Sequence, residues 1–421
     1  MILNLCRILF QYIINLNTIY YATFSKYYVI DFNNLLSKLD MKIGLFFPAV
    51  EYGGQEKNLI ALANAMHKKN VSVDVITYDD KKFITQTLNP EINRICLNKS
   101  KNKLSILRLL NFNNMLGTHL KSLSYLYKLL KHDDYDSIIC FQAGGLVSLV
   151  KKISGTNTKI IIREGISPKT LLKLQHSKLR AKILLFIKKN LYSYADMIVA
   201  NSHAGIEEIK ELTKKPKLKT IENICEFENI RIKKDNNFHK LFLNNKKTLI
   251  AVTRLNKVKR VDILINSLSV VNQMHDTQLI IIGEGPEKQI LKNLVKKLNL
   301  EENVHFLGFR DDVVQWMINA DIFVTASQVE GSPNSLIEAI CLGLPSIATD
   351  CPTGPKEILN NGELGILIPI NSEKHMIEAI RLLIEDESLR MKYINLSKSA
   401  KSRYSSERIV NLYLDAINSM N

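Results

Sequence analysis

The sequence predicts an α/β protein made of two Rossmann-like, doubly wound halves that face a central cleft. From Met41 onward, short apolar runs of strand length alternate with longer amphipathic stretches. The runs are continuously apolar, which is typical of strands buried on both faces of a parallel sheet. A polar stretch rich in Asn and Lys at 226–246 interrupts the alternation. We interpret it as the boundary between the two halves.

The predicted elements follow that alternation along the chain. Strands are expected at 42–47, 72–77, 136–141, 158–163 and 196–200, and then at 247–253, 277–282, 303–307, 321–325, 345–349 and 364–368. Helices are expected between them, for example at 55–69, 168–193, 260–274, 285–298 and 372–385. The resulting division is a first domain at 41–226, a linker at 227–246, a second domain at 247–402, and a C-terminal helix at 403–421 that returns to the first domain.

The composition fits a soluble globular protein with a substantial core. Of 421 residues, 46% are hydrophobic and 23% are charged, which excludes a disordered, fibrous or polytopic membrane chain. The 57 Lys and Arg residues against 41 Asp and Glu give a net charge of +16, which favours an anionic partner. Six scattered cysteines without a CxxC pair predict neither a disulfide framework nor a zinc site, and they suit a cytoplasmic location.

Residues 1–40 differ from the rest of the chain. They are apolar and aromatic, but polar residues interrupt them before about eighteen clean apolar residues accumulate. Basic residues ahead of an apolar run and a small-residue cleavage site, which mark a signal peptide, are not evident. We expect a poorly ordered extension or an upstream start here, with a membrane-surface helix as the alternative.

The segment 321–349 carries the strongest chemical pattern. A strand leads into a loop, after which Ser332 is expected as the N-cap of a helix and Pro333 in its first turn. Unpaired amides and the positive end of the dipole make such a helix start a seat for phosphate. Glu330 and Glu338 bracket it and suit the hydroxyl groups of a sugar and a ribose. The alternative is an ordinary capped helix with two solvated glutamates.

Further cations and glycines follow other predicted strands. The segment AVTRLNKVKR places Arg254 and Lys259 where they could neutralise a diphosphate, although a simple basic loop is the alternative. The segment LIIIGEGP allows close backbone approach to a ligand, but it lacks the third glycine of a dinucleotide site and the Lys-Ser/Thr of a P-loop. The segments VHFLGF and Gly53-Gly54-Gln55-Glu56 end two more strands with glycine turns, and the second leads into a helix.

Taken together, these motifs resemble one enzyme family. GGQE, RLNKVKR, GEGP, FLGF and EGSPNSLIE, in this order and spacing, resemble the GT-B glycosyltransferases of family 4, the glycosyl transferases group 1. The resemblance covers about 41–402 and is strongest over 247–369. It implies a retaining, metal-independent hexosyltransferase that moves a hexose or N-acetylhexosamine from a nucleotide sugar to a lipid-linked, lipopolysaccharide or capsule-type glycan. The stretch CPTGPKEIL resembles members that use UDP-sugars, so a UDP-sugar is favoured over a GDP-sugar.

The resemblance also implies residue roles. The positions of Arg254 and Lys259 hold the donor diphosphate, that of Glu338 binds the ribose hydroxyls, and that of Glu330 lies at the donor sugar. The predicted catalytic residues are therefore Glu330, Arg254 and Lys259. The complete predicted donor site, in which Gly308 and Phe309 cup the base, comprises Gly53, Gly54, Arg254, Lys259, Glu284, Gly308, Phe309, Gly331, Ser332, Pro333, Asn334, Ser335, Leu336 and Glu338.

No metal or cofactor besides the nucleotide sugar is expected. The family has no metal-dependent DxD motif, and Asp311-Asp312 and Asp133-Asp134 are interpreted as solvated carboxylates. By resemblance, Arg and Lys stabilise the leaving diphosphate, which helps to deprotonate the acceptor. Many relatives carry a His after the strand at 136–141, where this chain has Gln142 and Gly144. A catalytic residue of the first domain therefore stays unassigned.

Two basic stretches indicate the acceptor side. Residues 99–132 and 168–195 each hold seven Lys or Arg and no acid. The second reads as a basic amphipathic helix that could lie on the inner face of the cytoplasmic membrane, the alternative being a packed helix with a solvated basic face. The expected partners are the donor, a glycan or lipid-linked acceptor and an anionic membrane surface. Nucleic acid is not expected, because no recognition module is visible.

The same residues bear on three alternative functions. A nucleotide-sugar epimerase is disfavoured by the Glu-x7-Glu spacing of Glu330 and Glu338, and a phosphorylase by the lack of a pyridoxal-phosphate lysine signature. A catalytically silent family member that acts as a partner subunit is the remaining alternative. The intact Arg254 and Lys259 argue against it.

Overall fold

The computed structural model describes most of the chain from Met41 onward. The described residues are 41–47, 53–77, 87–97, 126–132, 135–165, 168, 178–213, 216–225, 238–242 and 246–420. Within this range, residues from Lys42 onward form one compact unit. The predicted extension at 1–40, most of the predicted linker, Asp133-Asp134 and most of the basic stretch 99–132 lie outside the described residues.

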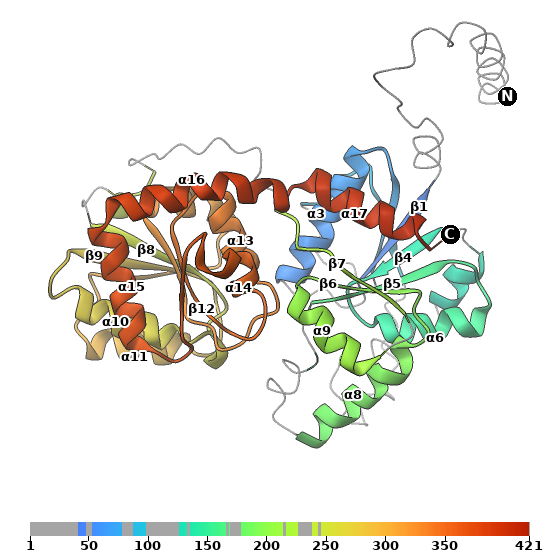
Figure 1. Cartoon of the computed structure of the whole chain (residues 1–421), viewed down its shortest axis with the longest axis horizontal. Helices are drawn as coiled ribbons and strands as arrows, with labels where there is room; N and C mark the ends of the chain where they lie inside the picture. Colours follow the sequence, from blue (N-terminus) through green and yellow to red (C-terminus); the bar gives the residue numbers. More distant parts are fainter. Residues whose placement is uncertain are drawn as a thin grey trace, which may run out of the picture. The chain divides into compact units, whose positions relative to one another are not determined.

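The first half is built on a parallel sheet of seven described strands in the order β3-β2-β1-β4-β5-β6-β7 (Figure 1). The strands are β1 (Lys42–Phe47), β2 (Ser72–Thr77), β3 (Asn93–Cys96), β4 (Ser137–Cys140), β5 (Lys159–Glu164), β6 (Met197–Ala200) and β7 (Lys217–Thr220). The apolar runs predicted the five inner strands. They did not predict β3 and β7, because these edge strands are four residues long and only partly buried.

Helices connect the strands of the first half. They are α3 (Gly54–Lys68), α6 (Gly144–Ser154), α8 (Lys178–Tyr192) and α9 (His203–Leu212). Helix α3 buries an apolar face that includes Leu59 and Met66, and it starts directly after the turn at Gly53. The predicted helix at 168–193 is described over 178–192, where it is α8. Among the described residues, no helix is both long and apolar enough to cross a membrane.

The second half is built on a parallel sheet of six described strands in the order β10-β9-β8-β11-β12-β13. They are β8 (Lys247–Val252), β9 (Thr277–Ile282), β10 (Val304–Gly308), β11 (Ile322–Thr325), β12 (Ser346–Thr349) and β13 (Ile366–Ile368). The helices are α10 (Val261–Val271), α11 (Lys288–Lys297), α12 (Val313–Asn319), α13 (Asn334–Cys341), α14 (Pro355–Ile358) and α15 (Glu373–Glu385). Two parallel-sheet halves of this kind confirm the predicted fold class.

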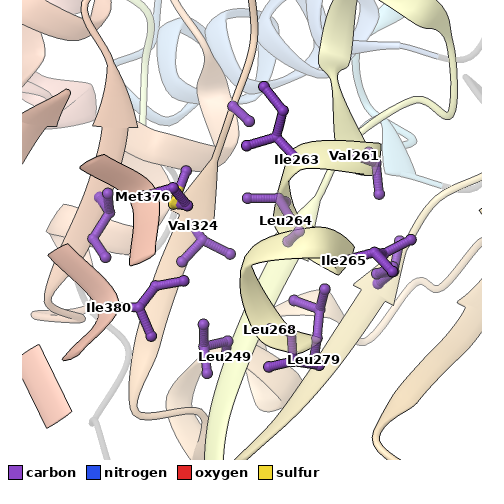
Figure 2. Close-up of a cluster of buried hydrophobic side chains, with 14 of the residues drawn as sticks. Leu249, Val261, Ile263, Leu264, Ile265, Leu268, Leu279, Val324, Met376 and Ile380 are labelled. Carbon is purple, nitrogen blue, oxygen red and sulfur yellow. The ribbon is translucent and has the colours of Figure 1, made fainter. Parts of the chain in front are cut away.

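Apolar clusters hold helices to both faces of the second sheet. On one face, α10, α11 and α15 pack on the strands, and on the other α12, α13 and α14 do so. Figure 2 shows side chains of α10 and α15 converging with those of the strands, among them Leu264, Leu268, Leu279, Val324, Met376 and Ile380. This packing buries the sheet on both sides and leaves its carboxyl-end loops to carry polar side chains.

Two C-terminal helices run from the second half to the first. Helix α16 (Glu387–Arg403) packs on α13, and α17 (Ser406–Asn418) packs on α3. Between them, the carbonyl of Tyr404 accepts a hydrogen bond of 2.9 Å from the backbone N–H of Cys225. The numerical domain boundaries stay a prediction.

Candidate functional site

The predicted site residues of the second half lie in loops that follow parallel strands. Arg254 and Lys259 follow β8, Glu284 follows β9, Phe309 follows β10, and Glu330 follows β11. Because all these strands are parallel, their carboxyl ends meet at one edge of the sheet. The topology therefore brings residues that are far apart in the sequence to the same edge.

The loop after β8 contributes a cation to a close ion pair. The Nζ of Lys259 lies 2.6 Å from Oε1 of Glu330, and the two side chains are only 20% and 11% exposed. Two of the three predicted catalytic residues are therefore in contact. Arg254, two residues after the end of β8, is exposed. Arg260, the next arginine along the chain, pairs with Asp262 at 2.9 Å.

After β11, the helix starts later in the chain than predicted. Helix α13 begins at Asn334, and its N-cap is Pro333, whose ψ of 113° is extended and whose side chain cannot cap. Ser332 is therefore not the N-cap, and Pro333 is not in the first turn, as the sequence had suggested. Glu338 lies on α13 and is buried, one turn beyond the helix start.

A second loop packs tightly on this one. The hydroxyl of Thr353 donates a hydrogen bond to the carbonyl of Glu330. Gly354 has a φ of +89°, and a Cβ added there would lie 2.6 Å from the carbonyl oxygen of Gly331. The loop that follows β12 thus fixes the backbone next to Glu330.

Cys351, in the same loop, has an unreactive thiol. It is buried, and burial together with the nearby Glu330 carboxylate raises the pKa of its thiol to about 12. The thiol therefore keeps its proton at neutral pH and is not a nucleophile there.

The backbone around the glycines after β9 leaves no room for a side chain. A Cβ at Gly283, whose φ is +140°, would lie 1.9 Å from the carbonyl oxygen of Thr253, and one at Gly285 would lie 2.2 Å from that of Leu255. The chain's own backbone thus accounts for both glycines, and the expectation that they also allow close approach of a ligand stays a prediction. Glu284 pairs with Lys288 at 2.6 Å, and its Oε1 lies 2.8 Å from the position of a Cβ on Gly308.

Two other predicted features are found at β10 and after it. Phe309, directly after β10, is 48% exposed, and its predicted role beside the base stays a prediction. Asp312 pairs with Arg310 at 2.7 Å, and this hydrogen-bonded ion pair lowers the pKa of Asp312. Asp312 is thus a carboxylate at the start of α12, as expected, but an arginine partners it.

The glycine turn of the first half contacts α13 of the second. Gly53 is the N-cap of α3, and the carbonyl of Gly54 accepts a hydrogen bond of 2.9 Å from Nδ2 of Asn334. A Cβ at Gly54 would lie 2.9 Å from that nitrogen. The structure therefore brings Gly54 and Asn334 together, although they are 280 residues apart.

Three residues that the sequence did not single out take part in this contact. Asn58 and Asn223 bond Asn334, and Arg163 bonds Asn223. All three are buried. A buried asparagine on the apolar face of α3 is the one local signal that could have revealed Asn58.

Comparisons with known proteins identify the family. The profile of the "Glycosyl transferases group 1" matches residues 233–400. An uncharacterized glycosyltransferase of Methanocaldococcus jannaschii is 31% identical over 300 residues, which span 63% of this chain and 73% of that protein. A Campylobacter jejuni protein named N-acetylgalactosamine-N,N'-diacetylbacillosaminyl-diphospho-undecaprenol 4-alpha-N-acetylgalactosaminyltransferase is 30% identical over 266 residues, 62% of this chain and 70% of that protein. The chain belongs to the group 1 glycosyltransferases.

Solved structures agree with the fold of this glycosyltransferase. Anabaena HepE in complex with UDP and glucose superposes with a TM-score of 0.71 at 20% identity, covering 90% of this chain and 100% of that one. A variant of Staphylococcus aureus TarM in complex with UDP and other ligands gives 0.72 at 16% identity, with 90% and 100% covered. At these identities the likeness concerns the fold alone.

Proposed function

We propose that this glycosyltransferase is a retaining, metal-independent enzyme that moves a hexose or N-acetylhexosamine from a UDP-sugar to a lipid-linked, lipopolysaccharide or capsule-type glycan. The observation that carries the proposal is the ion pair between Lys259 and Glu330, placed directly before the N-terminal turn of α13. A cation, a carboxylate and unpaired helix amides at one strand edge suit a sugar diphosphate. The UDP complexes of HepE and TarM support UDP.

Each group has a part in the proposed reaction. Arg254 and Lys259 stabilise the negative charge that grows on the leaving diphosphate. Glu330 orients a hydroxyl of the donor sugar and keeps Lys259 in place, while Glu338 binds the ribose hydroxyls. The leaving phosphate oxygen takes the proton of the acceptor hydroxyl, so a strong protein base is not required.

The acceptor proposal rests on the chemistry of relatives. Two Campylobacter jejuni relatives are named as N-acetylgalactosaminyltransferases that act on undecaprenol-diphosphate-linked sugars, and one of them aligns over 85% of this chain at 24% identity. A lipid-linked acceptor lies at a membrane. It also fits the excess of positive charge in the chain.

Transfer assays with the purified chain test the reaction. UDP-glucose, UDP-galactose and their N-acetylated forms, with GDP-mannose as the alternative, would be offered with undecaprenol-diphosphate glycans, with and without EDTA. We expect transfer from one UDP-sugar, unchanged by EDTA, to a product whose NMR spectrum shows the α-configuration of the donor. An inverted configuration in the product would contradict the retaining mechanism. Loss of activity in EDTA would contradict metal independence, and transfer from GDP-mannose alone would contradict the UDP-sugar donor.

We further propose that an anionic membrane surface on the cytoplasmic side is a partner and that helix α8 contacts it. Leu179, Ile183, Phe186 and Ile187 are 69%, 50%, 69% and 43% exposed. Their spacing places all four on one face of the helix. Tyr192, on the other side of α8, is buried. Helix α8 thus presents an exposed row of apolar side chains on one face, while its opposite face packs against the protein.

The charge of α8 favours a bilayer over a second copy of the chain. Its sequence, KLRAKILLFIKKNLY, contains cations and no acid, and Lys182 and Lys189 are exposed beside the apolar row. Apolar side chains could enter the interfacial region while the lysines meet anionic headgroups, each worth about 1 kcal/mol near the surface. Two copies of α8 would instead bring like charges together.

Vesicle sedimentation tests this surface without any need for enzyme activity. Phosphatidylcholine vesicles with and without phosphatidylglycerol would be compared for the native chain and for Leu179→Ser/Phe186→Ser. We expect binding to the anionic vesicles only, and a loss of about tenfold or more in the variant. The matched control Met274→Ser/Ile290→Ser removes side chains that are 56% and 59% exposed in the second half. The proposal would be overturned if both variants lost vesicle binding equally. It would also be overturned if the native chain formed a dimer that Leu179→Ser/Phe186→Ser disrupts and did not bind the anionic vesicles.

A further inference from the structure

Three asparagines tie the turn at Gly54 to the first turn of α13. Nδ2 of Asn58 donates to Oδ1 of Asn334 at 2.9 Å, and Nδ2 of Asn334 donates to the carbonyl of Gly54 at 2.9 Å. Nδ2 of Asn223 donates both to Oδ1 of Asn334 and to the carbonyl of Ser332, the latter at 3.1 Å. We call Asn58, Asn223 and Asn334 the asparagine bridge.

The bridge uses nearly all of its hydrogen-bonding capacity. Nδ2 of Asn58 also donates to the carbonyl of Gly54 at 3.0 Å, and its Oδ1 accepts from the backbone N–H of Ile224 at 3.0 Å. Asn58 and Asn223 are each 5% exposed. Buried amides with all donors and acceptors engaged fix a geometry, because any rotation leaves a buried group unsatisfied.

A buried arginine supports the bridge from the first half. Arg163, on β5, donates to Oδ1 of Asn223 and, at 3.1 Å, to the hydroxyl of Tyr413 on α17. Its guanidinium lies 4.9 Å from the centre of the Phe141 ring. Among the described residues, its recorded partners are uncharged. Arg163 therefore holds the amide of Asn223 in one orientation and links the bridge to α17.

We propose that Asn58, Asn223 and Asn334 are positioning residues for glycosyl transfer. They join the first half, which would hold the acceptor, to the first turn of α13, which would face the donor diphosphate. The inference rests on the proposed donor site. Hydrogen bonds between amides are short and directional, so the bridge fixes the spacing of the two loops. A misplacement of about 1 Å between reacting groups can slow a reaction about a hundredfold.

The bridge predicts a specific kinetic signature. Asn334→Ala removes the side-chain amide whose Oδ1 accepts hydrogen bonds from both other asparagines. It leaves the backbone N–H groups of α13 and the side chains of Arg254 and Lys259 in place. We expect kcat to fall about tenfold to a hundredfold, while the rise in melting temperature caused by UDP stays as in the native chain. Asn58→Ala should lower kcat similarly. The double variant should lose much less than the product of the two single losses, because both act through one unit.

Matched variants separate positioning from folding. Asn266→Ala removes another asparagine that donates a side-chain hydrogen bond, to Glu373, within the second half, and it should keep the native kcat. Asn334→Asp retains the shape and the acceptor Oδ1 but replaces the donor Nδ2 by an oxygen that cannot donate to Gly54, so we expect only partial activity. Native-like melting temperatures of these variants would establish that they fold.

Three outcomes would overturn the proposal. The first is a native kcat in Asn334→Ala, and the second is independent losses in Asn58→Ala and Asn334→Ala that multiply in the double variant. The third is loss of the UDP-induced shift in Asn334→Ala, since Asn334 would then bind the donor itself. A UDP shift that survives in Arg254→Ala would instead count against the proposed donor site and leave the kcat test of the bridge standing.

Discussion

The ammonium of Lys259 lies 2.6 Å from the carboxylate of Glu330, and both side chains are mostly buried. The pair joins the loop after β8 to the loop after β11. It makes the placement of each residue depend on the other. Removal of one partner leaves a charge that is neither paired nor fully solvated.

This dependence predicts non-additive stability changes. Lys259→Met or Glu330→Gln alone should lower the free energy of unfolding by about 1–3 kcal/mol, since a partly buried charge loses its partner. The double variant should be more stable than the less stable single variant. Urea unfolding measures this, with Lys374→Met/Glu378→Gln as the control pair, which is 80% and 58% exposed and 3.9 Å apart. Additive losses would show that the two side chains act separately.

Gly283 tolerates no side chain. Its φ of +140° and the carbonyl of Thr253, 1.9 Å from an added Cβ, both oppose Gly283→Ala. We expect a loss of about 2–4 kcal/mol or failure to fold. Gly155→Ala is the control: its φ is +68°, but nothing lies within 4 Å of the added Cβ. That change should cost about 1 kcal/mol, and equal losses at both positions would exclude the steric explanation.

The carboxylate of Glu357, on α14, binds the N-terminus of α9. Its carboxylate accepts backbone hydrogen bonds of 2.7 Å from His203 and 2.8 Å from Ala204. A negative charge at a helix N-terminus is worth about 0.3–1 kcal/mol. Glu357→Gln should therefore lower the free energy of unfolding by that amount at low salt and by less at high salt. The exposed Glu301→Gln serves as the control, and a salt-independent loss would contradict the charge effect.

The buried thiol of Cys351 predicts a pH effect on stability. Its pKa rises from the ordinary value of 9.0 to about 12 in the folded chain. The folded state therefore keeps a proton that the unfolded state releases, and the stabilising contribution is lost as the pH rises from about 9 through about 12. Between about pH 8 and pH 10, Cys351→Ala should lose less stability than the native chain does. Cys96→Ala, at a half-buried thiol, is the reference, and identical pH slopes for both variants would refute the assignment.

The sequence predicted the fold where local pattern determines it. Strands β1, β2 and β9 match their expected bounds, because each is a six-residue run with three or more apolar side chains that the sheet buries. The short edge strands β3 and β7 lack such a run and were missed. The N-cap at Ser332 was wrong because Pro333 keeps an extended backbone and delays the helix to Asn334.

The site was predictable only in part. Motifs such as EGSPNSLIE mark individual loops, and the parallel sheet brings those loops together. The partners of Asn334 could not be found in this way, because Asn58 is 276 residues away and carries no motif. Contacts of this kind depend on how two halves pack, which local periodicity does not encode. The roles of the individual site residues stay predictions.

Thermal unfolding with UDP, with GDP and without nucleotide tests the proposed donor site most directly. A ligand at a hundred times its dissociation constant stabilises a protein by about 2.7 kcal/mol. We expect UDP to raise the melting temperature of the native chain and of the control Lys292→Ala, an exposed lysine of α11. The rise should vanish in Arg254→Ala and in Glu338→Ala. No rise in the native chain, or an equal rise in both of those variants, would contradict a UDP-sugar site formed by these residues.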